Sequence, residues 1–485
     1  MSAWRGSVVL LLVALVSLPA AAGPKAPAKT PGGPAARPAA SPGAITFTPK
    51  EVESFVAEVV PRIEQIMQRK FKSIPPLVVG DAEAVARILA GDLEPTIRKE
   101  NPELSGAQLA EAALEDARAR MPNILGKYGM KAKKLGLMPA NLALTLHFHR
   151  IDRKHATGIL RIVIAHEITH ALQAQYVDIL DLLTKGETED ATAAYTAVIE
   201  GQAMFIQDRI GQALALVPAA EEYAKTFSAA GVDFPDDESR HAALYQEFIY
   251  MAGKRFTEHH YAKGGAARLW EILAHPPTAT SMIGHPETYS ASPPPRPDLS
   301  KVFAVPADDF GKRRWTLHER DLGEIHLRAF YADMDQTALD TFTGSVVAAR
   351  GLSAQSTRDD AALEFTLFLL TDKSAAAKTI ELLRGPIAED VKAATEEGTY
   401  RIKRSSDTKL TEIPCDASRV YTAVLADAAG KDVVEKRFIL AARGTILLEL
   451  QGDNCPLPSK RLQKILEGVF QSATEATGRQ KAPPR

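Results

Sequence analysis

The run Gly158–Gln175 constrains this chain more than any other segment, because it is apolar on nearly every side of a helix. Such a helix is stable only when other apolar elements surround it, so it must lie inside a sizeable core. The run nevertheless contains His166, Glu167 and His170. Buried polar side chains need partners that replace their lost hydration. The sequence therefore predicts a polar site inside a helical core.

These three residues form the pattern H-E-x-x-H, for which about 0.04 chance occurrences are expected in a chain of this composition. The spacing of four places His166 and His170 on one helical face, one turn apart, so that both imidazoles can bind one tetrahedral zinc ion. Glu167 can then take a proton from a bound water as a general base. The alternative is a pair of core histidines held by ordinary hydrogen bonds.

A catalytic zinc ion needs a third protein ligand. A metzincin would have Gly at position 173 and His at 176, but Gln173 and Tyr176 stand there, which excludes that class. Glu200 lies in the apolar run Ala191–Ile210, where a carboxylate costs several kcal/mol unless it is paired or metal-bound. We therefore expect Glu200 to complete a His2Glu set, and the alternative is a surface or salt-bridged glutamate. The alternatives are three acids of a polar segment that we expect to be solvated, namely Glu187, Glu189 and Asp190.

The segments His166–Tyr176 (HEITHALQAQY) and Ile199–Ala203 (IEGQA) resemble gluzincin-type zinc metallopeptidases. They are similar in particular to exported bacterial proteins that continue with PPT-x-T and HPE-x-Y, present here as Pro276–Thr280 and His285–Tyr289. The resemblance implies a zincin-like peptidase core with Zn2+ as cofactor and a peptide or protein substrate. It also implies that His166, His170 and Glu200 are the zinc ligands and that Glu167 is the base.

The chain departs from that pattern at Gln202 and Met204, where the resembling proteins carry acids. No carboxylate that would orient a ligand histidine is therefore identified from the motif. Asp178 and Asp181 are candidates for that role, and the alternative is that both are plain solvated acids. His285 follows a predicted helix, and we expect it either to donate a hydrogen bond to a substrate oxyanion or to order its loop.

The N-terminal residues predict export. Residues 1–22 have the charge, the apolar run and the Ala-x-Ala site of a signal peptide, and the apolar run is too short to span a bilayer comfortably. After its removal we expect a periplasmic, cell-envelope or secreted protein with no stable membrane span, and the alternative is an uncleaved membrane anchor. Residues 23–44 are rich in Pro and Ala and predict a flexible linker.

The rest of the chain predicts an α+β protein of two domains. Residues 45–290 are expected to form the mainly helical zincin-like domain, and the strand candidate Leu142–Phe148 is expected at the edge of its cleft. The proline cluster Ser292–Pro297 marks the boundary. Residues 300–473 predict a smaller α+β domain, followed by a disordered tail at 474–485.

Within residues 300–473 the sequence predicts strands and flanking helices. The expected strands are Ala362–Leu370, Tyr400–Ser405, Ser418–Asp427 and Val434–Leu450, the last being two strands joined across Arg443-Gly444. The expected helices are Ser374–Leu383 and Ser459–Phe470. Export makes a disulfide between Cys415 and Cys455 plausible, and two buried free thiols are the alternative.

Charge excludes one large class of partners. Lys and Arg total 58 against 60 Asp and Glu, so the net charge of −2 gives no field that attracts nucleic acid. Two functions remain. The first is an exported zinc-dependent peptidase, and the alternative is a non-catalytic envelope or interaction protein that keeps the zinc helix as a scaffold.

Overall fold

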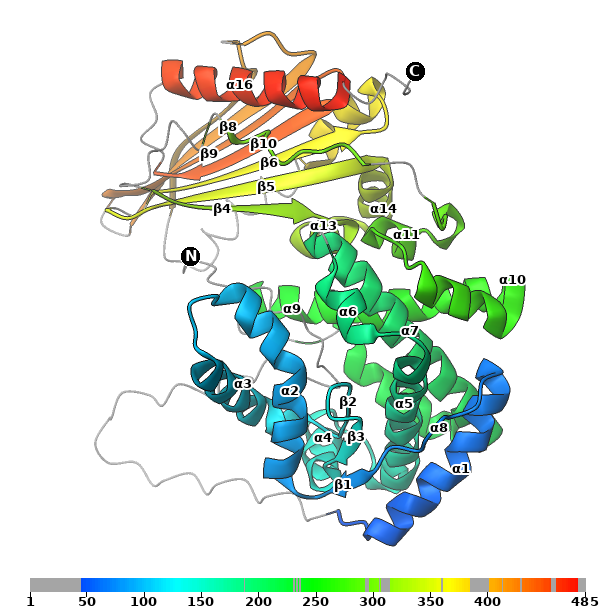
Figure 1. The fold of residues 1–485 in the computed structure, drawn as a ribbon. Helices are drawn as coiled ribbons and strands as arrows, with labels where there is room; N and C mark the ends of the chain where they lie inside the picture. Colours follow the sequence, from blue (N-terminus) through cyan, green and yellow to red (C-terminus); the bar gives the residue numbers. More distant parts are fainter. Residues whose placement is uncertain are drawn as a thin grey trace, which may run out of the picture. The chain divides into compact units, whose positions relative to one another are not determined.

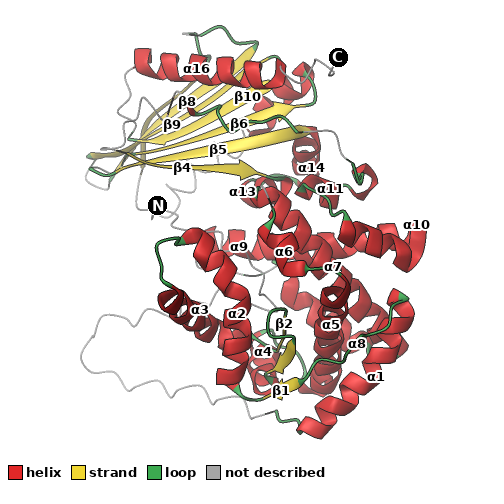
Figure 2. Ribbon diagram, in the orientation of Figure 1, coloured by secondary structure: helices red, strands yellow, loops and turns green. Residues whose placement is uncertain are grey.

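A computed structural model describes residues 45–478, apart from gaps at 187, 230–231, 233, 235–236, 293–295, 305, 307–314, 359–360, 384–400, 412, 428–429 and 455–458. The predicted signal peptide and linker lie outside the described residues. The chain divides into two compact units, Met1–Ala291 and Ser292–Arg485, so the division falls at the predicted proline cluster. The predicted mixed α+β class is confirmed: the first unit is mainly helical, and a separate antiparallel sheet forms the second (Figure 1 and Figure 2).

The first unit consists mainly of helices. They are α1 (Pro49–Met67), α2 (Ala82–Glu100), α3 (Gly106–Arg120), α4 (Leu142–Phe148), α5 (Ala156–Tyr176), α6 (Ile179–Thr184), α7 (Glu189–Ala213), α8 (Val217–Ala224), α9 (Asp237–Glu247), α10 (Gly253–Ala274) and α11 (Thr280–Gly284). A π-helical stretch, η5 (Phe248–Ala252), joins α9 to α10. Capping boxes at Thr48 and Ser105 satisfy free N–H groups and so set the starts of α1 and α3.

Helices α5 and α7 form the centre of this unit. They pack against each other, and nearly every residue from Gly158 to Gln173 and from Asp190 to Gln207 is buried. Helices α1 and α8 also pack against both of them. This confirms the prediction that the apolar run of α5 lies inside a helical core.

A small sheet lies beside α5. Its strands β1 (Leu77–Val79), β2 (Gly126–Gly129) and β3 (Lys134–Leu137) have the order β1-β3-β2. Strand β3 pairs in parallel with β1 and antiparallel with β2, and β2 at the edge contacts α5. The sequence did not predict these strands, because three or four residues are too few to show an alternating pattern.

The prediction of a strand at Leu142–Phe148 was wrong, because these residues form α4. A short apolar run does not by itself distinguish a strand from a helix. Leu144 and Phe148, four residues apart, are exposed, while Leu142 and Leu146 are buried, which is a helical pattern. The side chain of Asn141 donates to the carbonyls of Met121 and Ile124 and so fixes the start of the helix.

The second unit contains one antiparallel sheet of order β4-β5-β6-β10-β9-β8-β7. The strands are β4 (Trp315–Leu322), β5 (Val346–Ser356), β6 (Ala362–Leu370), β7 (Arg401–Thr408), β8 (Ala417–Ala426), β9 (Asp432–Arg443) and β10 (Ile446–Asp453). On β6, Phe365 packs with α16 (Ser459–Gly478) on one face of the sheet. Phe368 packs on the other face with α14 (Gln336–Ser345), α13 (Glu324–Phe330) and the helical residues 373–383.

Most predicted elements of this unit are confirmed, and the tail is corrected. The four predicted strand segments correspond to β6, β7, β8 and the β9–β10 pair. Helix α16 continues to Gly478, past the predicted start of the tail at 474, because Ala473 is buried and Ala476 packs on the same cluster. Cys415 is half-buried with a free thiol, and Cys455 lies outside the described residues. Among the described helices, none combines the length and the apolar character needed to cross a bilayer.

Candidate metal centre

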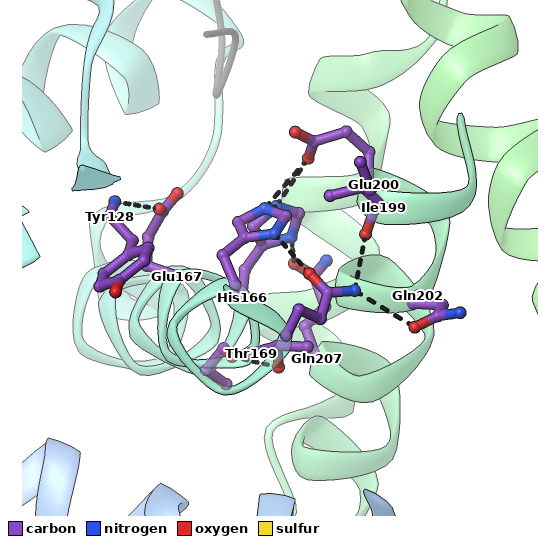
Figure 3. Close-up of polar contacts among 11 residues, drawn as sticks. Tyr128, His166, Glu167, Thr169, Ile199, Glu200, Gln202 and Gln207 are labelled. Carbon is purple, nitrogen blue, oxygen red and sulfur yellow. Dashed lines mark hydrogen bonds and ion pairs between the residues drawn. The ribbon is translucent and has the colours of Figure 1, made fainter. Parts of the chain in front are cut away.

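Helices α5 and α7 bring together two histidines of one helix and a glutamate of the other (Figure 3). His166 and His170 lie one turn apart on α5, and Glu200 reaches both of them from α7. The Nε2 atoms of the two imidazoles are 3.0 Å apart. Oε2 of Glu200 lies 3.0 Å from Nε2 of His166 and 3.3 Å from Nε2 of His170. The three residues predicted as ligands therefore meet in one cluster.

The spacing of these three donor atoms suits a tetrahedral zinc ion. Ligand atoms about 2.0–2.1 Å from zinc at the tetrahedral angle are about 3.3–3.4 Å from one another. The separations in the cluster, 3.0, 3.0 and 3.3 Å, are close to that triangle. Two imidazole nitrogens with one carboxylate oxygen are also the donor set of one class of catalytic zinc site, in which a water takes the fourth position.

Without a metal ion, the acid and the bases of the cluster stabilise each other's charge. Burial by itself raises the pKa of the Glu200 carboxyl, but the charge of His170 and hydrogen bonds from both histidines bring this pKa well below its ordinary value. Burial lowers the pKa of His170, but the charge of Glu200 and a hydrogen bond to it outweigh burial, so that this pKa is raised. Removing either partner would therefore leave an uncompensated buried charge.

Glu167 lies beside the cluster and is not one of its three donors. Its Oε2 accepts a hydrogen bond of 2.5 Å from the backbone N–H of Tyr128 on β2 (Figure 3). Gly126 permits this close approach of β2 to α5, since a Cβ atom there would lie 2.9 Å from Val163 and 3.1 Å from Glu167. A carboxylate that is held next to the donors and is not itself a ligand is suitably placed for a general base.

Sequence reasoning missed two tyrosines near this site. Tyr250, in η5, donates a hydrogen bond to Glu200, and its ring centroid is 6.3 Å from that of His166. Tyr223, in α8, is fully buried, and its hydroxyl has no hydrogen-bond partner among the described residues. Burial first, and then the charges of Glu167 and Glu200, raise the pKa of both hydroxyls. Both therefore remain protonated donors at neutral pH, and no sequence motif marks either one.

Glutamines hold the outer nitrogens of both histidines. Nδ1 of His170 lies 2.9 Å from Oε1 of Gln173, and Nδ1 of His166 lies 3.2 Å from Oε1 of Gln207. All four side chains are buried. The carboxylate that the motif left unidentified is thus replaced by neutral amides. The sequence contained one indication of these partners: Gln173 follows His170 by three residues on the same helix, a spacing at which two side chains can contact each other.

The two acids considered as partners of the histidines lie elsewhere. Asp178 accepts the backbone N–H of Asp181 and so caps the start of α6. Asp181 is exposed and forms an ion pair with Lys185. Both carboxylates therefore have surface partners, as expected for solvated acids.

The alternative ligands also lie outside the cluster. Glu189 is exposed at the start of α7, and Glu187 is outside the described residues. The expectation that Asp190 is solvated was wrong, since it is 1% exposed. Its Oδ1 accepts the backbone N–H and the hydroxyl of Thr280, because α11 packs over the start of α7.

His285 follows α11 and is not among the donors of the cluster. Its Nδ1 lies 3.9 Å from a carboxylate oxygen of Glu287. Helix α11 contacts α7 at Asp190, about 15 Å along the helix from Glu200 at a rise of about 1.5 Å per residue. The contacts of α11 do not bring His285 to the cluster, and its role toward a substrate oxyanion stays a prediction.

Two glycines explain how η5 comes close to Glu200. A Cβ atom on Gly201 would lie 2.1 Å from the carbonyl carbon of Gly253, and one on Gly253 would lie 2.2 Å from the carbonyl oxygen of Ala197. No side chain fits at either position, so the backbones of α7 and α10 touch directly. The glycine after Glu200 is therefore required by packing.

Replacing Gly201 by alanine is expected to destabilise the protein by about 3 kcal/mol, at the upper end of the usual cost of overpacking, because the added methyl meets backbone. Gly211→Ala on the same helix is the matched control, since its Cβ would meet only Ala220 at 3.5 Å. That control should gain up to about 1 kcal/mol from helix propensity. Urea unfolding of both variants measures the difference, and equal stabilities would contradict the packing argument.

The cluster is closed to solvent. The exposed fractions of its residues are His166 0%, Glu167 1%, His170 2% and Glu200 6%. Beside it, the rings of Tyr223 and Phe227 meet edge to face with centroids 5.3 Å apart, and the ring of Phe227 lies tilted against that of Tyr250 at 4.7 Å. An extended peptide can reach Glu167 only after such neighbouring elements move.

Comparisons with known proteins do not assign the chain to a family. No family model matches it, and no curated protein matches it significantly. Among solved structures, the extracellular domain of PknH from Mycobacterium tuberculosis is similar over 36% of this chain and 91% of that chain, with 8% identity and a TM-score of 0.21. A likeness at this level says nothing about function.

Proposed function

We propose that the protein is an exported zinc-dependent peptidase. The observation that carries this proposal is the triangle of donor atoms from His166, His170 and Glu200 with the carboxylate of Glu167 beside it. The first three residues would hold the ion, and a fourth position would remain for water. Export rests on the predicted signal peptide. The HEITHALQAQY and IEGQA segments of the sequence support the same class of enzyme.

In this proposal the chemistry is divided between the ion and the chain. Bound zinc would lower the pKa of a water toward about 7 and polarise the carbonyl of the scissile bond. Glu167 takes the proton of the attacking water and later gives it to the leaving amine. The N–H of Tyr128 holds Oε2 of this carboxylate, so Oε1 is the oxygen that would exchange the proton.

In this proposal the two buried tyrosines have separate roles: Tyr223 donates a hydrogen bond where negative charge develops, and Tyr250 holds a ligand. Tyr223 has a protonated hydroxyl with no partner among the described residues, and it lies within the electrostatic reach of Glu167 and Glu200. Tyr250 is tied to Glu200 and holds that ligand in place. A preorganised donor in a dry site stabilises an oxyanion much more strongly than a donor in water does.

Zinc removal tests the proposal with two measurements. The full chain at zinc 100-fold above its dissociation constant should be more stable than the chelated chain by about 2.7 kcal/mol. At about 2–4 °C per kcal/mol, this raises the Tm by about 5–10 °C. The zinc-loaded chain should cleave an unfolded protein, and this cleavage should stop when a chelator removes the zinc. If the Tm of the chain does not change on adding zinc, the metal site itself is contradicted.

The near-complete burial of the cluster favours a second candidate function, a non-catalytic envelope or interaction protein with a structural zinc ion. Structural zinc sites are closed and stabilise the fold. This candidate predicts the same increase in Tm on zinc binding but no cleavage of unfolded proteins or peptide libraries at any zinc concentration. The two readouts together therefore separate the candidates.

A further inference from the structure

The amide of Gln173 is fixed in one orientation by the groups around it. Its Nε2 lies 3.2 Å from the carbonyl oxygen of Ile199 and 3.2 Å from Oε1 of Gln202. A backbone carbonyl can only accept hydrogen bonds. Gln173 must therefore present its NH2 group to Ile199, which turns Oε1 toward His170. Figure 3 shows the contacts at Ile199 and Gln202.

The orientation of Gln202 is fixed in the same way. Its Nε2 donates to the carbonyl oxygen of Leu269, on α10, at 3.1 Å. Its Oε1 is thereby left to accept from Gln173. The hydrogen bonds run in one direction, from His170 to Gln173, to Gln202 and to Leu269. Two backbone carbonyls, those of Ile199 and Leu269, set this direction, so the chain of amides cannot be reversed without losing both.

We propose that Gln173 and Gln202 are positioning residues that keep a proton on Nδ1 of His170 and so keep its Nε2 available for a metal ion. Oε1 of Gln173 can only accept, so the Nδ1 facing it must donate. An imidazole protonated at Nδ1 binds a metal through Nε2, the atom that faces Glu200 and His166. This inference rests on the proposed metal site.

His166 provides an internal contrast. Its partner Gln207 is also buried, but Nε2 of Gln207 has no hydrogen-bond partner among the described residues. No backbone carbonyl fixes that amide. We call the hydrogen bonds from His170 through Gln173 and Gln202 to Leu269 the relay. Among the two histidines, only His170 has such a relay to set its tautomer. It also explains why an amide stands at position 202: a carboxylate there could not donate to Leu269.

The test compares zinc affinity, by chelator competition, in the full chain and in methionine variants of similar size. Gln173→Met should weaken zinc binding about 10–100-fold, the usual effect of losing a partner of a ligand histidine. Gln202→Met should give a smaller loss in the same direction. The double variant should match Gln173→Met, because Gln202 acts only through Gln173. Gln212→Met, at an exposed position of α7, is the control and should not change affinity.

Nitrogen NMR of histidine-labelled, metal-free chain supplies a readout that is independent of affinity. In the wild type the neutral ring of His170 should carry its proton on Nδ1, and in Gln173→Met this preference for Nδ1 should be lost. An unprotonated Nδ1, or losses in the two single variants that add up in the double variant, would overturn the relay. If the wild type binds no zinc, the metal site fails by itself, and the NMR of the metal-free chain still decides the relay.

Discussion

Replacing Glu167 by glutamine is expected to lower peptide hydrolysis by about two to four orders of magnitude while zinc content stays unchanged. The amide has nearly the same shape, and its oxygen can still accept the N–H of Tyr128. What it loses is the ability to hold the proton of the attacking water. Because Glu167 is not among the three donor atoms, the metal site remains intact.

Turnover at saturating substrate and zinc content per chain are the two measurements for Glu167→Gln. Glu449→Gln is a matched control, since Glu449 is equally buried at 2% exposure but lies in the second unit. It should leave hydrolysis unchanged. If Glu167→Gln kept more than a tenth of the wild-type turnover, Glu167 would not be the base, and loss of zinc in this variant would make it a ligand.

Replacing Glu200 by alanine is expected to remove zinc from the protein. It deletes the anionic donor of the cluster, so the loss of affinity should exceed the 10–100-fold typical of partners outside the ligand shell. In the metal-free protein it also leaves His170 without the carboxylate that sustains its charge, which burial opposes. Hydrolysis should therefore be lost together with the metal.

Elemental analysis after dialysis against a weak chelator measures the effect of Glu200→Ala, with His170→Ala as a second ligand variant. The matched control is Glu189→Ala, an exposed carboxylate of the same helix. It should keep one zinc ion per chain. Zinc retained at wild-type affinity in Glu200→Ala would show that another carboxylate is the third ligand, and Glu167, next to His166, would be the first to examine.

The sequence predicted the helical elements of this protein better than its short elements. Long apolar runs identified α5 and placed Glu200 inside the buried helix α7. The segment Leu142–Phe148 was misassigned because seven residues fit both periods, and only its packing against other helices decided for α4. The edge strand β4 was missed because its exposed, charged residues carry no apolar alternation.

Some parts of the candidate site could be predicted from the sequence and others could not. The identities and spacing of His166, Glu167 and His170 determined which chemistry the chain can perform, because a helix fixes the relative positions of residues four apart. The spacing of residues in the sequence did not show which side chains contact His166, Glu167 and His170. Tyr223 and Tyr250 come from segments without a motif, and they lie near the donors only because α8 and η5 pack against α7.

The sequence by itself determined a buried helix with two imidazoles on one face and a carboxylate on a second apolar helix. Only the tertiary structure decided which atoms orient those imidazoles. Gln202 is separated from Gln173 by 29 positions and from Leu269 by 67, so their hydrogen bonds depend on where three helices meet. Local sequence fixes geometry within one helix turn, whereas the direction of a buried hydrogen-bond chain is set by backbone carbonyls that only packing brings within reach.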